Sequence, residues 1–243
     1  MRTKEFIKSE WLQMLILLVP FVFAGLFWDK FPDRIPTHWN FRGQVDAYSG
    51  KYFGLLWLPV VNIGLCGLFL VLPKIDPRKK NYGLFRGPYK AFRVVMTLFM
   101  AVIFFTIALV SLGYKLSVPG VICYTSILLF LVIGNYIGNI RPNWFVGIRT
   151  PWTLDNPEIW RRTHRMAGRL LVASSMVMLL LGIVVRGRLF QVLFFGYVIA
   201  FVALVPTVYS YVLHRRGTAE PAINDSAVKP SGEAEATDKD LKA

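Results

Sequence analysis

Six stretches of the chain lack Asp, Glu, Lys and Arg altogether, and their lengths limit what it can fold into. They contain 18, 22, 21, 25, 16 and 25 residues and lie, in chain order, at Trp11–Trp28, Tyr52–Pro73, Val94–Tyr114, Leu116–Ile140, Leu170–Val185 and Leu189–Leu213. A helix that crosses a bilayer needs about 20 predominantly apolar residues, within a range of roughly 17–25. Five of the six stretches meet this length and the fifth along the chain is marginal. A soluble enzyme is therefore excluded.

The apolar stretches are predicted to be helices. In the hydrocarbon core every backbone N–H and C=O group must be satisfied within the protein, and a uniformly apolar segment achieves this as a helix. Barrel strands would instead alternate apolar and polar residues. Charged residues make up only 17% of the chain, against about 25% in an average soluble domain. The predicted fold class is all-α: a polytopic transmembrane helical bundle of about six spans.

Lysine and arginine are distributed unevenly between the two ends of these spans. If the N-terminus is cytoplasmic, 18 of them lie near the membrane on the inner side and seven lie on the outer side. Cytoplasmic loops carry the basic excess in membrane proteins. Both termini are thus predicted to be cytoplasmic, and residues 1–216 form one membrane domain with an outer loop at 29–51 and an inner loop at 139–169.

This topology accounts for the net charge of +14. Basic residues at the inner leaflet meet anionic lipids, so anionic lipids are expected partners and direct nucleic-acid binding is not. Residues 217–243 differ from the rest, because they hold six acids, three lysines and no aromatic residue. A segment with so little to bury is predicted to be a disordered cytoplasmic tail.

The stretch Leu170–Val185 would reach only about 24 Å as a helix. It is expected to borrow length from the helix that enters it, or to let Arg186 extend to the outer interface. The outer turn that follows it, Arg186–Arg188, is short. If this stretch failed to span, the membrane orientation of everything after residue 170 would be inverted.

Groups for catalysis or metal binding are sparse. In the predicted topology His38 lies outside, whereas His164 and His214 lie inside, so the three histidines cannot share a site. No cysteine cluster or carboxylate pair completes a set of metal ligands. We therefore predict no metal, no cofactor and no enzymatic activity.

Amides are the strongest polar groups within the predicted spans. Ion-coupled transporters usually carry a charged residue inside the membrane, and these spans carry none. Asn62 and Asn135 could bind an uncharged polar group, which supports an alternative function as a permease or exporter for a small neutral or amphiphilic solute. Amide side chains more often hydrogen-bond between helices, and that structural role is favoured here.

The outer loop is predicted to fold into a compact surface of its own. Pro32 and Pro36 impose extended or turn geometry, and Gly43 marks a further turn. Aromatic and polar side chains alternate between these points, and two interpretations stand equal: a surface that grips an amphipathic peptide or a headgroup, or a loop anchored by its aromatic residues. The candidate ligand-binding residues are Asp33, Arg34, His38, Trp39 and Asn40.

The inner loop contains a helix start, because Asn156 suits an N-cap, Pro157 a first turn and Glu158 the positive end of the helix dipole. Apolar residues then recur at helical spacing opposite several arginines. This predicts an amphipathic interfacial helix on the inner leaflet before span five. The Pro-bounded turn before it could dock a cytoplasmic partner, and the candidate partner-binding residues are Asn143, Arg149, Thr150, Trp152, Arg161, Arg162 and His164.

Two motifs in these loops resemble those of a known family. The inner loop reads NWFVGIRTPWTL over residues 143–154, followed by Trp160 and by HRMAGR over residues 164–169. These residues closely resemble the hallmark of the SdpI family of bacterial membrane proteins. The outer PDRIPTHWN, residues 32–40, is similar to the motif of an uncharacterised domain that often precedes that hallmark.

The family takes its name from an immunity protein against a secreted, sporulation-delaying peptide toxin. The resemblance therefore implies a multi-pass protein of the bacterial cell membrane that protects the cell from a secreted peptide toxin at its outer face. It also implies sequestration of a cytoplasmic transcriptional repressor at the inner face, and it supplies no catalytic residues. An immunity or sensor protein is the predicted function, with the permease as the alternative.

Overall fold

The computed structural model describes residues 3–40 and 42–217, with side chains from Glu10 onward. Five helical segments are long and apolar enough to cross a membrane. They are α2 (Lys51–Ile75), η2 with α3 (Lys79–Phe85 and Arg86–Ser111), α4 (Val118–Ile137), α6 (Pro157–Val184) and the run of α7, η3 and α8 (Gly187–Tyr197, Val198–Leu204 and Val205–Gly217). The helical, polytopic class is thereby confirmed.

The first predicted span corresponds to α1 (Thr3–Leu26). This helix has 24 residues, and its segment Glu10–Leu26 is apolar. The predicted tail at 217–243 lies, apart from Gly217, outside the described residues.

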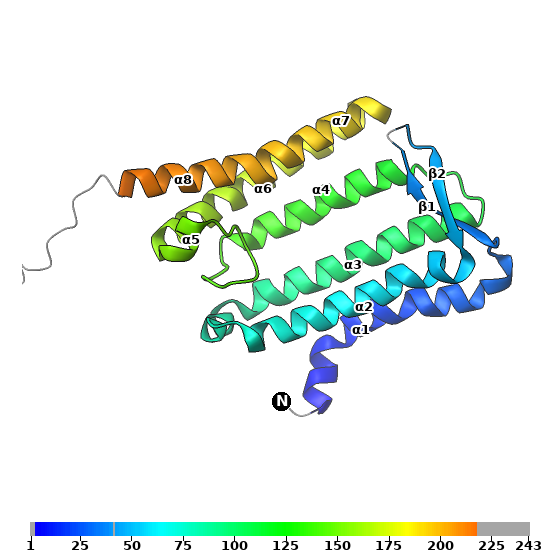
Figure 1. Ribbon diagram of the computed structural model, residues 1–243, viewed down its shortest axis with the longest axis horizontal. Helices are drawn as coiled ribbons and strands as arrows, with labels where there is room; N and C mark the ends of the chain where they lie inside the picture. The colour runs from blue at the N-terminus through cyan, green and yellow to red at the C-terminus, as the bar shows by residue number, and fades with distance from the viewer. Residues whose placement is uncertain (1–2, 41, 218–243) are drawn as a thin grey trace, which may run out of the picture.

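The long helices lie side by side along the long axis of the molecule (Figure 1). In this bundle α3 contacts α1, α2 and α4, and α6 contacts α4 and α8. A β-hairpin lies across one end, which we call the hairpin end; η2 and the short α5 (Pro151–Asp155) lie at the opposite end, which we call the loop end. The two ends carry the two motifs found in the sequence.

The hairpin consists of β1 (Arg34–Trp39) and β2 (Val45–Gly50), which pair antiparallel. It follows α1 through the 3-10 turn η1 (Trp28–Lys30). The turn between the strands forms because the Asn40 side-chain oxygen accepts hydrogen bonds from the backbone N–H groups of Arg42 and Gln44, at 2.8 and 3.1 Å. Gly43 supplies a φ of 75° there. The all-α prediction omitted this small sheet.

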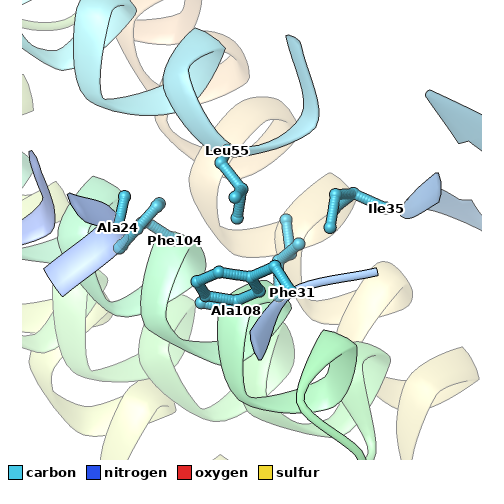
Figure 2. Packing of buried hydrophobic residues seen from close by; sticks show 7 residues of the cluster. Ala24, Phe31, Ile35, Leu55, Phe104 and Ala108 are labelled. Carbon is cyan, nitrogen blue, oxygen red and sulfur yellow. The ribbon is translucent and has the colours of Figure 1, made fainter. Parts of the chain in front are cut away.

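A hydrophobic cluster seats the hairpin on three helices. Ile35 of β1 and Phe31 pack against Ala24 of α1, Leu55 of α2 and residues of α3 (Figure 2). Ile35 is fully buried. A Cβ atom at Gly54 would overlap the Ile35 side chain, so the glycine lets the strand approach α2 closely. The hairpin is therefore a packed part of the bundle.

Polar side chains join α1, α2 and α3 within the bundle. The Gln13 amide donates to Thr97 Oγ1 at 2.8 Å, and the Asn62 amide donates to the Thr97 carbonyl at 3.1 Å. The favoured structural role of Asn62 between helices is thus confirmed. Asn135, by contrast, is exposed on α4, so the two asparagines do not face one site.

Arg93 is one of the 18 basic residues counted near the inner side, but it lies on α3 inside the bundle. Its guanidinium Nη2 lies 2.7 Å from Glu10 Oε2, and both side chains are buried to about nine-tenths. The two residues flank the uncharged stretches in the sequence, so their pairing across α1 and α3 gave no local signal. Burial is tolerated because each charge neutralises the other.

The expectation of a separate amphipathic helix on the inner leaflet is corrected. The residues concerned form the first turns of α6, which runs unbroken over 28 residues. At 1.5 Å per residue this is about 42 Å, longer than a hydrocarbon core of about 30 Å. The apolar side of these turns is buried in the protein, with Trp160 and Ala167 nearly inaccessible. The expected borrowing of length by the fifth stretch is confirmed.

Glycines allow α4 and α6 to cross closely. Gly134 of α4 faces Gly168 of α6, and a Cβ at Gly134 would lie 2.8 Å from Leu171 Cβ and 3.0 Å from the Val172 nitrogen. A Cβ at Gly168 would lie 2.8 Å from the Gly134 carbonyl oxygen. Backbone cannot yield as a flexible side chain can, so small residues are required on both helices.

We expect Gly134→Ala to destabilise the protein, because the added methyl group must separate α4 from α6. Overpacking of this kind costs about 1–3 kcal/mol, enough to lower the midpoint of thermal unfolding in detergent. Gly67→Ala is the matched control, since nothing lies within 4 Å of a Cβ there. Equal unfolding midpoints for the two variants would contradict the requirement for a glycine where α4 crosses α6.

Candidate functional site

A groove of about 720 Å³ lies at the hairpin end. The hairpin residues Thr37–Asn40 form one wall, and α2, α3, α4 and α7 form the others. Most of the lining side chains are aromatic or aliphatic, among them Phe53, Trp57, Ile103, Ile122, Phe194 and Phe195. The polar side chains that line it are few and include Thr37, His38, Asn40 and Gln191.

Three of the five candidate ligand-binding residues line this groove: His38, Trp39 and Asn40. Asp33 and Arg34 do not. The Asp33 carbonyl instead accepts a hydrogen bond from the Lys51 backbone at 2.9 Å, and the Arg34 guanidinium lies 5.8 Å from the centre of the Tyr48 ring. Asp33 therefore connects the base of the hairpin to the start of α2, and Arg34 lies near Tyr48 of the neighbouring strand.

His38 forms the exposed polar rim of the groove. Its Nδ1 lies 2.5 Å from Asp46 Oδ1 on the neighbouring strand, and the two side chains are 68% and 42% exposed. Hydrogen-bonding groups here are within reach of a ligand, while the groove wall below is apolar. Such a division suits a ligand that is itself amphipathic, because pockets of this size bind through apolar area and orient through a few polar groups.

The loop end forms a second structure, which we call the platform: residues 76–85 and 139–156. Asp76, only 1% exposed, holds the two segments together. Its Oδ1 accepts from the Arg78 N–H at 2.7 Å, and its Oδ2 accepts from the Tyr82 hydroxyl and the Trp144 N–H at 3.0 Å. Asn81 adds a 2.7 Å bond to the Pro142 carbonyl. One carboxylate thus connects α2 to the inner motif.

Two of the candidate partner-binding residues, Asn143 and His164, have no exposed surface. Asn143 Oδ1 accepts from the N–H groups of Phe145 and Val146, at 2.9 and 2.7 Å. His164 Nε2 accepts from the Ile148 N–H at 3.0 Å, which leaves Nδ1 to donate to the Trp160 carbonyl at 2.8 Å. In this conformation both residues shape the platform from within.

Thr150 and Trp152 connect the platform to α8. Thr150 is the N-cap of α5, and its hydroxyl lies 3.4 Å from that of Ser210. The Trp152 indole N–H donates to Ser210 Oγ at 2.6 Å, and its ring stacks on His214 at 5.8 Å between centroids. Thr150 is buried and Trp152 is half-buried, so their main contacts are internal.

The other three candidate partner-binding residues, Arg149, Arg161 and Arg162, are exposed. Arg149 donates to the Trp144 carbonyl at 2.7 Å, and the Trp144 ring is itself 45% exposed. Arg161 pairs with Glu158 one turn earlier on α6. These side chains, and not the buried ones, form the surface that a partner could contact.

Metal binding has no counterpart in the part of the chain that the structure describes. Within residues 3–40 and 42–217 no three His, Cys, Asp or Glu side chains gather closely enough to hold an ion. His38 and His164 lie at opposite ends of the bundle, one in β1 and one in α6.

Sequence analysis did not identify some residues of these two sites. Asp76 and Ser210 each stand alone among apolar or basic neighbours, and their partners are 68 and 58 residues away. The groove walls come from four helices, so no local motif marks them. The Asp-Pro pair that ends α2 was the one available signal, since Asp before Pro favours a turn.

Two segments of the chain match models of known protein families. Residues 139–210 match the model of the SdpI/YfhL protein family, and residues 15–63 match a domain of unknown function, DUF1648. The predicted resemblance to the SdpI family is confirmed. The SdpI/YfhL region contains most of the platform, α6 and part of α8, whereas the other domain contains the hairpin.

The immunity protein SdpI of Bacillus subtilis (strain 168) is 25% identical over 175 residues, which are 72% of this chain and 81% of that protein. No solved structure matches the chain. The chain is thus a multi-pass membrane protein similar to a known immunity protein.

We expect Asp76→Asn to loosen the platform, because an amide cannot accept hydrogen bonds with both of its side-chain atoms. Losing charge-assisted bonds at a buried position costs about 1.5–3 kcal/mol. Trypsin should then cleave the detergent-solubilised protein faster after Arg149. Asp155→Asn, at an exposed position of the same platform, is the control, and equal cleavage of the two variants would refute the role of Asp76.

Proposed function

We propose that this protein is an immunity protein that protects the membrane by holding a secreted amphipathic peptide in the hairpin-end groove. The groove itself is the observation that carries the proposal. Its apolar wall is continuous with membrane-spanning helices, and its polar rim is on the hairpin. The similarity to an immunity protein supports the same function, and retention without turnover requires no catalytic group.

The proposal places the hairpin end outside the cell and both termini in the cytoplasm. The basic excess at the loop end supports this orientation. A secreted peptide then meets the groove first, before it can insert elsewhere in the bilayer.

The peptide would bind with apolar side chains against Trp57, Ile122 and Phe194 and with its polar face toward His38 and Asp46. Burying one large apolar side chain yields about 1.5–3 kcal/mol. Several such anchors are needed, because association and ordering cost several kcal/mol before any net affinity appears. Trp39, which lines the groove from β1, is the best placed aromatic contact of the hairpin.

At the loop end we propose that the platform receives a cytoplasmic repressor. Support comes from the exposed Trp144 and Arg149 of the platform and from the exposed Arg161 and Arg162 of α6, since aromatic and arginine side chains are enriched at protein interfaces. The platform is preorganised by Asp76, which lowers the cost of ordering on binding.

The permease alternative has less support. It relied on Asn62 and Asn135, but Asn62 is bonded to Thr97 and Asn135 is exposed on α4. A transport path needs polar groups that face a common cavity, and these two do not.

Cysteine labelling tests the orientation. Cys66 and Cys123 are buried and free, so they contribute little background. Ala47→Cys on the hairpin should react with a membrane-impermeant maleimide in intact cells, whereas Asp155→Cys on the platform should react only after permeabilisation. The reverse pattern would place the groove in the cytoplasm and end the proposal.

Protection itself is tested by membrane potential. In a susceptible bacterium challenged with a pore-forming peptide of the sporulation-delaying type, the dye-reported potential should survive when this protein is expressed. Trp39→Ala and His38→Ala should abolish the protection, and Ile122→Trp should do so by filling the groove. Loss of one large contact costs about 2–3 kcal/mol, or roughly thirtyfold to 150-fold in the protective dose.

Trp144→Ala is the matched control, because it removes the same side chain at the opposite end of the bundle. All variants are compared at equal amounts in the membrane. Protection that persists in Trp39→Ala and Ile122→Trp would contradict the groove as the site. Collapse of the potential with the unaltered protein would contradict protection from this peptide.

A further inference from the structure

Four arginines of α6 line one hollow at the loop end. Arg161, Arg162, Arg165 and Arg169 surround a cavity of about 590 Å³ together with Met166, Leu170 and Tyr209. Tyr209 comes from α8, so the hollow, which we call the arginine groove, lies between two helices that pack against each other. All four arginine side chains are exposed.

The arginine groove is strongly cationic. Arg161 pairs with Glu158, but among the described residues no carboxylate lies within ion-pair distance of Arg162, Arg165 or Arg169. Guanidinium groups one turn apart on a helix repel each other. An arrangement of this kind is stabilised by an anion that bridges the groups, and guanidinium binds phosphate through paired hydrogen bonds.

Apolar residues form the rest of the lining. Met166 and Leu170 adjoin the arginines, and Leu170 begins the uncharged stretch that continues to Val185. The groove therefore sits at the boundary between the charged and the apolar part of α6. An anion that fits both parts has a phosphate head and a hydrocarbon tail.

We propose that the arginine groove is a binding site for an anionic phospholipid, with the lipid phosphate held by Arg162, Arg165 and Arg169 and the acyl chains lying along α6 and α8. Arg161, Arg165 and Arg169 recur every four residues and extend over about 12 Å of helix. That span accommodates two phosphates, so a diphosphatidylglycerol lipid should bind more tightly than phosphatidylglycerol. Basic pockets between spanning helices are the usual form of such sites.

This inference does not rest on the proposed function. It concerns the end of the bundle opposite the peptide groove, and it shares only Arg161 and Arg162 with the proposed repressor surface. A lipid site would stabilise the protein whichever peptide or solute it handles. Anything that binds the folded state alone raises its apparent stability.

The test uses the full chain purified in a mild detergent. Diphosphatidylglycerol, phosphatidylglycerol, phosphatidylcholine or inorganic phosphate is added, thermal unfolding is followed, and retained lipid is counted by native mass spectrometry. Diphosphatidylglycerol should raise the unfolding midpoint most, phosphatidylcholine should not raise it, and inorganic phosphate should have little effect. Arg165→Gln/Arg169→Gln should weaken the response to diphosphatidylglycerol by about tenfold or more in lipid concentration.

Arg86→Gln/Arg216→Gln is the matched control, because it removes the same charge from exposed positions outside the groove. An equal loss in both double variants would mean diffuse attraction and overturn the site. An equal response to inorganic phosphate would overturn the lipid as ligand. A single Arg165→Lys variant keeps the charge but loses the paired geometry, so an intermediate response supports the proposal and an unchanged one contradicts the paired geometry.

Discussion

The need to satisfy every polar group inside the bilayer governs the rest of this structure. Backbone groups are satisfied by helix formation, and the side chains that could do other chemistry are bonded to one another. Gln13 and Asn62 both bond to Thr97, and Arg93 pairs with Glu10. Hydrogen-bonding groups that face outward are consequently found at the two ends of the bundle, and it is there that the groove and the platform form.

Much of the fold could be predicted because hydropathy in a membrane is a strong and local signal. A run without charges identifies a span whatever it packs against. The hairpin gave no such signal: its strands have six residues each, Pro36 interrupts β1, and the strand is specified by Ile35 fitting over Gly54. The burial of the first turns of α6 was also hidden, because an amphipathic segment looks the same whether its apolar side meets lipid or protein.

The candidate sites were predictable in position and not in detail. The motifs at residues 32–40 and 143–154 mark both ends of the molecule, but residue chemistry does not tell an exposed histidine from a buried one. His38 lines the groove, whereas His164 accepts a bond from a loop backbone and stacks on Trp160. The walls of the groove lie on four helices far apart in the chain, and only packing brings them together.

The placement of polar groups also bears on mechanism. A carrier must release its cargo on the other side, so polar groups of its spans have to exchange partners during each cycle. Here the amides nearest the middle of the bundle are engaged with Thr97, and the charged pair joins α1 to α3. Breaking such a buried pair leaves a charge uncompensated at a cost of about 3–5 kcal/mol. A bundle built in this way suits binding at its ends, which is what the proposed retention of a peptide at the hairpin end and of a lipid at the loop end requires.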